Sequence, residues 1–342
     1  MNLFLELLQV ALGTRDCLSR TPSDAEWNSL FNEIQRQAIV GVMLEGLERL
    51  PQEQLPSQQL LLQWIGVVNI NEATYRLHCE RAKELTRRFC QSGFHSCVLK
   101  GIGLAGLYPN PAHRQCGDID LWVDRKHKDV LVYLRSEYSV ENVFWHHAEA
   151  RIFEDVSTEI HYRPCWMYNP FHNYKLQRWF DIRQREQMTL DEKLCFAYPK
   201  VQFNAVYSLA HFYHHLIEEG IGIRHVIDYY YILQALPANE RGSVIEDLKR
   251  FGLLKLAKAV MWILKDVCGM SAEYLICEPN EKEGRFLFEE MMRGGNFGHY
   301  RNDNRKRNTV GRMFALLPHY PREVLWVVPW KLWHRIWMVF NQ

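Results

Sequence analysis

The stretch Val98–Asp124, VLKGIGLAGLYPNPAHRQCGDIDLWVD, is the most informative part of this sequence. It starts in a short β-type run, His95–Leu99, passes through a glycine-rich turn into a helical run, and ends in a second apolar strand, Ile119–Val123. Further strands are expected at 144–147, 151–156 and 158–162, with a helix over 125–137. Residues 94–165 are therefore predicted to form a mixed unit of four or five strands with helices.

Two aspartates, Asp118 and Asp120, open the second strand directly after Gly117. Side chains two positions apart on a strand point to the same face, so both carboxylates are expected to project together. Two adjacent carboxylates repel each other unless a cation lies between them, and hard oxygen ligands at a strand end suit Mg²⁺. A pair of surface aspartates at a turn is the alternative, because the pattern Asp-x-Asp alone is common.

A glycine-rich turn, Leu99-Lys100-Gly101-Ile102-Gly103, follows the first strand. Such a turn points free backbone N–H groups toward an anion, and Lys100 adds a point charge. The alternative is a tight turn whose glycines provide positive φ. The GxxxxGK[ST] spacing of a P-loop is absent from the sequence.

Taken together, LKG, Tyr108, Arg114, GDIDL and Val123 resemble the signature of the nucleotidyltransferase superfamily related to DNA polymerase beta. The chain is most similar to the family of uncharacterised nucleotidyltransferases, and the resemblance covers most of its length. It implies an α+β fold with a polymerase-beta-like mixed sheet. The sequence pattern divides into an N-terminal helical region (1–92), the nucleotidyltransferase core (93–187) and a C-terminal helical region (188–342).

The resemblance also implies a third carboxylate on a neighbouring strand. Thr158-Glu159-Ile160-His161-Tyr162 is similar to the family's acid-x-His strand, so Glu159 is assigned as the third acid. His161 could orient Glu159 or contact the acceptor, and a histidine packed on the strand is the alternative. Asp155 is a competing candidate, but the residues beside it do not resemble the motif. Glu159 departs from the wider superfamily, in which most relatives carry Asp as the third acid.

The implied activity is a Mg²⁺-dependent transfer of a nucleoside monophosphate from an NTP, with ATP expected, to an acceptor hydroxyl with release of pyrophosphate. A small-molecule acceptor is favoured over a protein hydroxyl. The catalytic, metal-binding residues implied are Asp118, Asp120 and Glu159. The nucleotide-binding residues implied are Lys100, Gly101, Gly103, Arg114 and Gly117.

A second candidate cluster lies on a helix expected over 204–219. His211 and His215 are four apart and share a face, so with Glu218 or Glu219 they could form a metal site of a metal-dependent hydrolase. Packing is the alternative, and the pattern is not HExxH.

Residues 211–233 also resemble the family's helical segment of histidines followed by Arg-x-x-x-Asp. Arg224 and Asp228, four apart, are expected to form a helix salt bridge or to line the nucleotide or acceptor cleft. A non-catalytic nucleotide- or partner-binding module on the same fold is the remaining alternative to an enzyme.

Composition limits the partners. The 342 residues are 47% hydrophobic and 24% charged, as in ordinary globular proteins, and the net charge is only +1. This balance argues against nucleic acid as a partner. A basic loop at Gly294–Arg307 could still grip a triphosphate or single-stranded nucleic acid, or could simply be solvated; its cations are Arg301, Arg305, Lys306 and Arg307.

The cysteines and the apolar runs predict a cytoplasmic protein. Nine cysteines are scattered without a CxxC pair, which favours reduced thiols over disulfides or a cysteine-based zinc site. The sequence has no run of 18 apolar residues, and the N-terminus lacks the basic start of a signal peptide, so no membrane span is expected. The tryptophan-rich segment Val324–Phe340 is predicted to be a packed terminal helix, with an interfacial membrane helix as the alternative.

Overall fold

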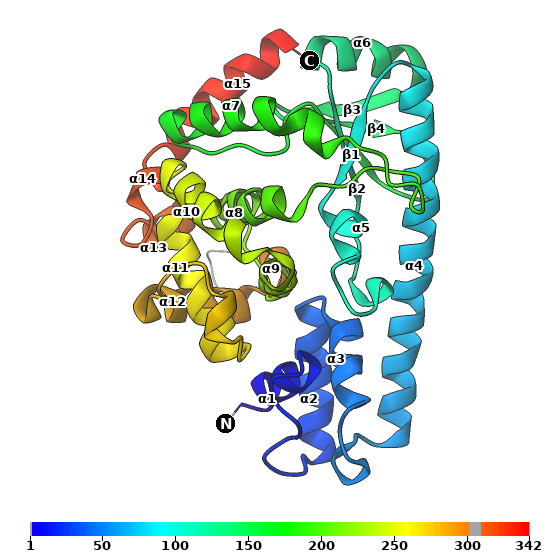
Figure 1. Cartoon of the computed structure of the whole chain (residues 1–342), viewed down its shortest axis with the longest axis vertical. Helices are drawn as coiled ribbons and strands as arrows, with labels where there is room; N and C mark the ends of the chain where they lie inside the picture. Colours follow the sequence, from blue (N-terminus) through cyan, green and yellow to red (C-terminus); the bar gives the residue numbers. More distant parts are fainter. Residues whose placement is uncertain (1, 301–308, 342) are drawn as a thin grey trace.

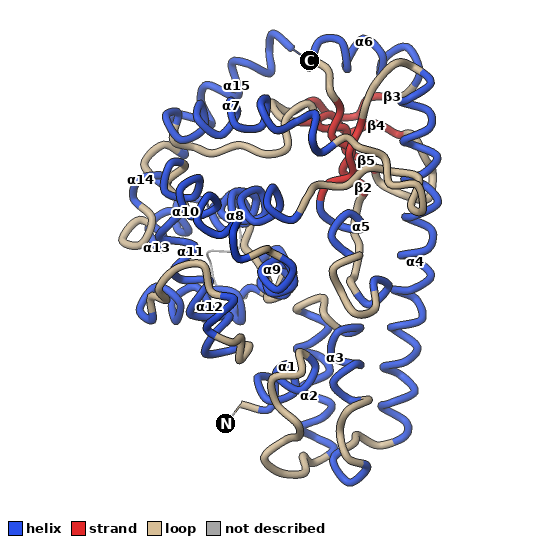
Figure 2. The backbone as a smooth tube through the Cα atoms, viewed as in Figure 1, coloured by secondary structure: helices blue, strands red, loops and turns tan. Residues whose placement is uncertain are grey.

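The fold was analysed in a computed structural model, which describes residues 2–300 and 309–341. It is an α+β structure in which a five-stranded mixed sheet lies among helices (Figures 1 and 2). The strand order is β1-β2-β5-β4-β3, with β2 and β5 parallel and the other neighbours antiparallel. The strands are β1 (Ser96–Leu99), β2 (Ile119–Val123), β3 (Ser139–Val143), β4 (His147–Arg151) and β5 (Thr158–His161).

The two faces of the sheet differ in character because side chains alternate along each strand. On one face, Leu121 and Ile160 are fully buried in a core that also contains Leu85 and Phe89. Those two residues belong to α4 (Gln58–Gln91), and α6 (His127–Glu137) contributes to the same core. The opposite face carries the polar side chains described below.

Helix α4, with 34 residues, links the sheet to the N-terminal helices (Figure 1). These are α1 (Leu3–Ala11), α2 (Asp24–Arg36) and α3 (Val40–Leu47). Ser23 caps the N-terminus of α2 and forms a capping box with Glu26. The first half of α4 buries Trp64 and Val68 in the core shared with α1–α3, and its second half packs under the sheet.

The remaining helices cover the side of the sheet that carries the polar residues. Between β1 and β2 lies α5 (Lys100–Ala105). Gly252, with a φ of 72°, lies in the turn between α10 (Arg241–Arg250) and α11 (Leu254–Trp262). The other helices are α7 (Pro170–Gln187), α8 (Val201–Glu218), α9 (Arg224–Ala235), α10 (Arg241–Arg250), α11 (Leu254–Trp262, continued by a π-helical turn, Ile263–Val267), α12 (Glu281–Gly294), α13 (Thr309–Leu316), α14 (Pro321–Val324) and α15 (Val327–Asn341).

Two of the expected strands are displaced. Residues 144–146 form the turn between β3 and β4, and 152–156 form the connection from β4 to β5. The edge strand β3 exposes most of its polar residues, so it has no apolar alternation to reveal it. The neighbouring strand β4 begins at His147, which is the last residue of the strand expected at 144–147.

The tryptophan-rich C-terminal helix α15 packs by one side only. Trp330 stacks on Trp166 with ring centroids 4.2 Å apart, whereas Leu332, Ile336 and Phe340 are exposed. Within the described part of the chain, every helix is too short or too polar to cross a bilayer.

Candidate functional site

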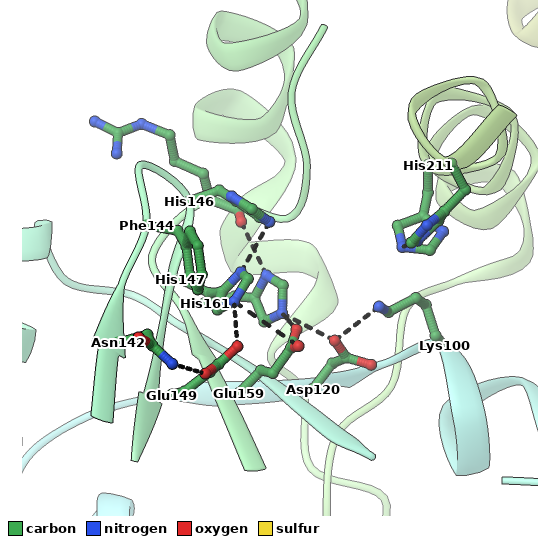
Figure 3. A network of polar contacts seen from close by, with 12 residues as sticks. Lys100, Asp120, Asn142, Phe144, His146, His147, Glu149, Glu159, His161 and His211 are labelled. Carbon is green, nitrogen blue, oxygen red and sulfur yellow. Dashed lines mark hydrogen bonds and ion pairs between the residues drawn. The ribbon is translucent and has the colours of Figure 1, made fainter. Parts of the chain in front are cut away.

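A row of carboxylates crosses the middle of the sheet. Asp120 on β2 pairs in register with Glu159 on β5, which pairs with Glu149 on β4. One step along, His161 pairs with His147. Residues paired across strands, and residues two apart within a strand, share a face. All five side chains therefore lie on the face opposite α4 (Figure 3).

Asp120 is the buried centre of this row, with 1% of its surface exposed. Its Oδ1 atom lies 2.8 Å from Lys100 Nζ and 2.9 Å from His161 Nε2. His161 Nε2 also lies 3.1 Å from Glu159 Oε2, so one imidazole joins the two carboxylates. The ligand atoms of Asp120, Glu159 and His161 lie within 4.8 Å of one another, which is close enough to surround a single cation.

The charges of this cluster support each other. Burial alone would raise the pKa of Glu159, but the hydrogen bond from His161 and the nearby His147 and Lys100 lower it to about 2. Burial alone would lower the pKa of His161, but its bonds to Asp120 and Glu159 raise it to about 9. At neutral pH, Glu159 is therefore ionised and His161 is an imidazolium.

Lys100 reaches Asp120 because the backbone turns sharply at this point. Lys100 and Gly101 have φ values of 47° and 36°, so the expected positive-φ turn is present. A Cβ atom at Gly103 would lie 2.3 Å from the Val98 carbonyl oxygen, which requires glycine there. Burial alone would lower the pKa of Lys100, but Asp120, Asp118 and Glu159 raise it. The turn thus delivers a buried ammonium group to the carboxylates.

Asp118 stands apart from the other two predicted acids. It precedes β2, is half-buried and lines the cavities on both sides of Lys100. Among the described residues, the groups whose ligand atoms lie within 4.8 Å of one another include Asp120 and Glu159 but not Asp118. The structure therefore groups Asp120 with Glu159, and Asp118 lies outside that group but close enough to Lys100 to raise its pKa.

The polar face of the sheet opens into a cavity of about 730 Å³. Helices α8 and α15 form its opposite wall, with His211 facing Lys100 (Figure 3). Burial, followed by the neighbouring positive charges, holds the pKa values of His146, His211 and His214 well below the ordinary range. These imidazoles are therefore neutral, and the stacked Trp166 and Trp330 add an aromatic wall.

A second, smaller cavity of about 160 Å³ lies on the other side of Lys100 and Asp118, and it is lined by Arg114, Arg224 and Asp228. The expected salt bridge between Arg224 and Asp228 is replaced by another pairing. Arg114 Nε and Nη2 donate to the two oxygens of Asp228 at 2.7 and 2.8 Å.

Arg224 instead donates to the Gln115 carbonyl oxygen at 2.9 Å, and its Nε atom has no partner among the described residues. The reason is geometric, because the buried Arg114 approaches Asp228 from a distant part of the chain with both of its guanidinium nitrogens aligned. Gly101 and Gly117 also line this smaller cavity.

Three polar residues of the site were missed by the sequence analysis: His146, His147 and Glu149. His147-Ala-Glu149 repeats the two-residue spacing of Asp118-Ile-Asp120 and Glu159-Ile-His161. That repetition is the signal that could have revealed them. It was hidden because the strand was expected to end at His147.

The helical pair His211 and His215 forms no described group of three metal ligands. Their Nε2 atoms lie 3.0 Å apart, so the two rings hydrogen-bond to each other. The four cations of the basic loop, Arg301, Arg305, Lys306 and Arg307, lie outside the described residues.

The comparison with protein families agrees with this geometry. The family model described as "Uncharacterised nucleotidyltransferase" matches residues 23–269. The match covers most of the chain, which therefore belongs to the uncharacterised nucleotidyltransferase family. This confirms the resemblance drawn from Val98–Asp124, and membership implies a transferase with an NTP as substrate. No curated protein and no solved structure matches the chain significantly.

Proposed function

We propose that this protein is a Mg²⁺-dependent nucleotidyltransferase with a polymerase-beta-like core. It would move a nucleoside monophosphate from an NTP, ATP in the first instance, to a hydroxyl of a small molecule. The observation that carries the proposal is the in-register pair of Asp120 and Glu159 on adjacent parallel strands beside Lys100, with Glu159 lining the large cavity and Asp120 the smaller one.

The donor set fits Mg²⁺. The oxygens of Asp120 and Glu159 are hard ligands on paired positions. Asp118, which lines both cavities, is a third candidate ligand. Lys100 and His161 now supply the positive charge that two adjacent carboxylates require. When bound, Mg²⁺ would neutralise the phosphates and lower the pKa of the attacking hydroxyl.

The residues around these acids suit the transfer. The acceptor hydroxyl attacks the α-phosphorus, so that a new P–O bond forms while the bond to the β-phosphate oxygen breaks and pyrophosphate leaves. Glu159 is ionised and could take the hydroxyl proton, but a pKa of about 2 makes it a weak base and favours its role as a ligand. Lys100, the turn at Gly101 and Gly103, Gly117 and Arg114 are the candidates for holding the triphosphate.

The two cavities suggest where the substrates bind. The smaller one contains arginines and the glycine turn, which suits phosphates. The cavity of about 730 Å³ has the size of a small-molecule site, and its aromatic and histidine walls suit a compact polar acceptor.

All nine cysteines are free, which supports a reducing compartment such as the cytoplasm.

The test is pyrophosphate release from each NTP with Mg²⁺ across a library of hydroxyl-bearing metabolites. Asp120→Asn should lower the rate by about 10³-fold or more, because it removes a charge aimed at the reacting phosphate and its cation. Asp124→Asn is the matched control, since Asp124 follows the same strand but binds His95, and its rate should be unchanged. A folded Asp120→Asn variant that keeps the wild-type rate would refute the proposal.

One observation favours a non-catalytic nucleotide-binding module as the second candidate. Lys100 and His161 both contact Asp120 Oδ1, so this carboxylate is already neutralised without a metal. Calorimetry with ATP and Mg²⁺ separates the two candidates. Binding of ATP without transfer to any acceptor would favour the module.

A further inference from the structure

Beyond the acids discussed so far, β4 and β5 bring together three polar atoms that share no hydrogen bond. They are His147 Nε2, Glu149 Oε1 and Glu159 Oε1, and they lie within 4.8 Å of one another. His147 Nε2 is 3.9 Å from the Glu149 oxygen and 3.8 Å from the Glu159 oxygen. Figure 3 shows the three side chains converging from the two strands.

His147 is the unusual member of this group. Only 9% of its side chain is exposed, and its Nε2 atom is buried without a hydrogen-bond partner among the described residues. Its other ring nitrogen, Nδ1, lies 2.8 Å from His146 Nε2. The ring is therefore fixed from behind, with Nε2 directed at the two carboxylates. Metal-bound histidines are commonly held in this way, by a hydrogen bond to the ring nitrogen that does not bind the metal.

The distances discriminate between a hydrogen bond and a shared cation. An N–H group that donates to a carboxylate lies at roughly 2.7–2.9 Å from the oxygen. Two atoms that each bind a tetrahedral zinc ion at about 2.0–2.2 Å lie roughly 3.3–3.6 Å apart. The separations of 3.8 and 3.9 Å are too long for a hydrogen bond and only a few tenths of an ångström above the zinc range, so a small closing movement of the side chains would bring all three atoms to an ion.

The two carboxylates are also held in place by their second oxygens. Glu149 Oε2 accepts a hydrogen bond from Asn142 on the edge strand, and Glu159 Oε2 faces His161. Each carboxylate thus keeps Oε1 for the space in front of His147. Glu159 turns one oxygen to the Asp120 side and the other to the His147 side, so it stands between two candidate cation positions.

We propose that His147, Glu149 and Glu159 form a binding site for a divalent transition metal ion of the zinc type. The imidazole nitrogen favours Zn²⁺ and its neighbours over Mg²⁺, which prefers oxygen ligands alone. Three protein ligands beside an open cavity leave coordination positions for water or substrate. The proposal stands on contacts of β4 and β5 and holds whether or not the protein transfers nucleotides.

The test is isothermal titration calorimetry of the full chain, stripped of metal by a chelator, with Zn²⁺ and separately with Mg²⁺, in the absence of nucleotide. Wild type should bind Zn²⁺. His147→Gln and Glu149→Gln should each weaken Zn²⁺ binding by at least about 10-fold, because each removes a ligand, and the loss of affinity should be larger for Zn²⁺ than for Mg²⁺.

The matched controls carry the same substitutions away from the site. His95→Gln alters an exposed histidine that pairs with Asp124, and Glu154→Gln alters an exposed glutamate that pairs with Arg151; both should bind Zn²⁺ as wild type does. Equal Zn²⁺ affinity of wild type, His147→Gln and Glu149→Gln would overturn the proposal. So would loss of Zn²⁺ binding in Asp120→Asn alone.

Glu149→Gln keeps the test decisive if His147→Gln does not fold, since Glu149 is only half-buried and the substitution keeps its size. Co²⁺ added to wild type provides a second readout. Visible absorption typical of nitrogen and oxygen coordination is expected in wild type and should be lost in Glu149→Gln. A spectrum unaffected by this substitution would also contradict the site.

Discussion

Two buried ionic clusters flank the glycine-rich turn, and they are built in opposite ways. In the Asp228 cluster (Tyr108, Arg114 and Asp228), Arg114 bonds to both oxygens of one carboxylate and the Tyr108 hydroxyl donates at 2.6 Å. In the Asp120 cluster (Lys100, Asp120, Glu159 and His161), two cations share Oδ1 of Asp120, while Glu159 Oε1 accepts no described hydrogen bond.

The difference distinguishes a structural tie from the site proposed to be reactive. Both oxygens of Asp228 accept hydrogen bonds, so the Asp228 cluster fastens α9 to the loop before β2. The Asp120 cluster leaves Glu159 Oε1 without a described hydrogen bond, and its Lys100, Glu159 and His161 line the large cavity. Incompletely paired buried charges are costly in a fold and are found where chemistry needs them.

The largest effect on stability is expected from Asp228→Asn. It leaves the buried Arg114 guanidinium without a counter-charge, which should lower the free energy of unfolding by about 3–5 kcal/mol in urea denaturation. Asp120→Asn should cost less, because Glu159 and Asp118 still face Lys100 and His161. Equal losses in the two variants would erase the distinction between the clusters.

Acid titration gives a second measure of the same variant. Burial alone would raise the pKa of Asp228, but Arg114 and Tyr108 hold it below its ordinary value. Its contribution to stability is therefore complete above the unfolded-chain pKa of about 3.9 and is lost as the pH falls through the lower folded value. Asp228→Asn should remove this acid-side loss from the unfolding curve.

Arg224→Gln tests the cation beside the Asp228 cluster that forms no ion pair with a described carboxylate. Arg224 lines the smaller cavity, and its Nε has no described partner, so it is available to a phosphate. We expect the substitution to weaken NTP binding by about 10- to 100-fold, the value of one or two charged hydrogen bonds, with a melting temperature close to that of wild type. Calorimetry with a non-hydrolysable NTP measures the affinity; unchanged binding would remove Arg224 from the nucleotide site.

Tyr108→Phe removes the neutral member of the Asp228 cluster. Arg114 still pairs with the Asp228 carboxylate in this variant. The free energy of unfolding should therefore fall by about 1.5–3 kcal/mol, which is less than in Asp228→Asn. The free energy of unfolding from urea titration checks it. A loss as large as that of Asp228→Asn would mean that the hydroxyl, rather than the guanidinium, dominates the cluster.

The smallest effect is expected at an exposed ion pair. Glu246 and Lys249, on the surface of α10, lie 2.7 Å apart with at least half of each side chain exposed. Glu246→Gln should change the free energy of unfolding by less than about 1 kcal/mol, because water and salt screen such pairs. A greater loss would show that charge pairing on the surface rivals that in the buried clusters.

The sequence predicted those parts of the fold that local patterns encode. The strands β1 and β2 are short runs rich in apolar residues, and β5 alternates polar and apolar side chains. Glu159 was assigned from the family resemblance, and the register of β2 with β5 pairs it with Asp120. The edge strand β3 was displaced because its exposed polar residues carry no hydrophobic period.

Contacts between distant segments could not be predicted in the same way. Arg224 and Asp228 have the spacing of a helix salt bridge, yet Asp228 binds Arg114, which lies 114 positions away in the sequence. Likewise, only the register of β4 with β5 shows that His147 and Glu149 lie beside His161 and Glu159. Spacing rules describe neighbours on one element, and a site assembled from several elements needs the packed structure.

Helix α4 also has a consequence for how the chain could be shortened. Its residues Trp64 and Val68 pack in one hydrophobic core and Leu85 and Phe89 in the other, so this single helix belongs to both cores. A version lacking residues 1–57 would expose a tryptophan-bearing stripe to water and would invite aggregation. Helices α1–α3 are thus needed to cover the first half of α4, whose second half supports the sheet that carries the acids.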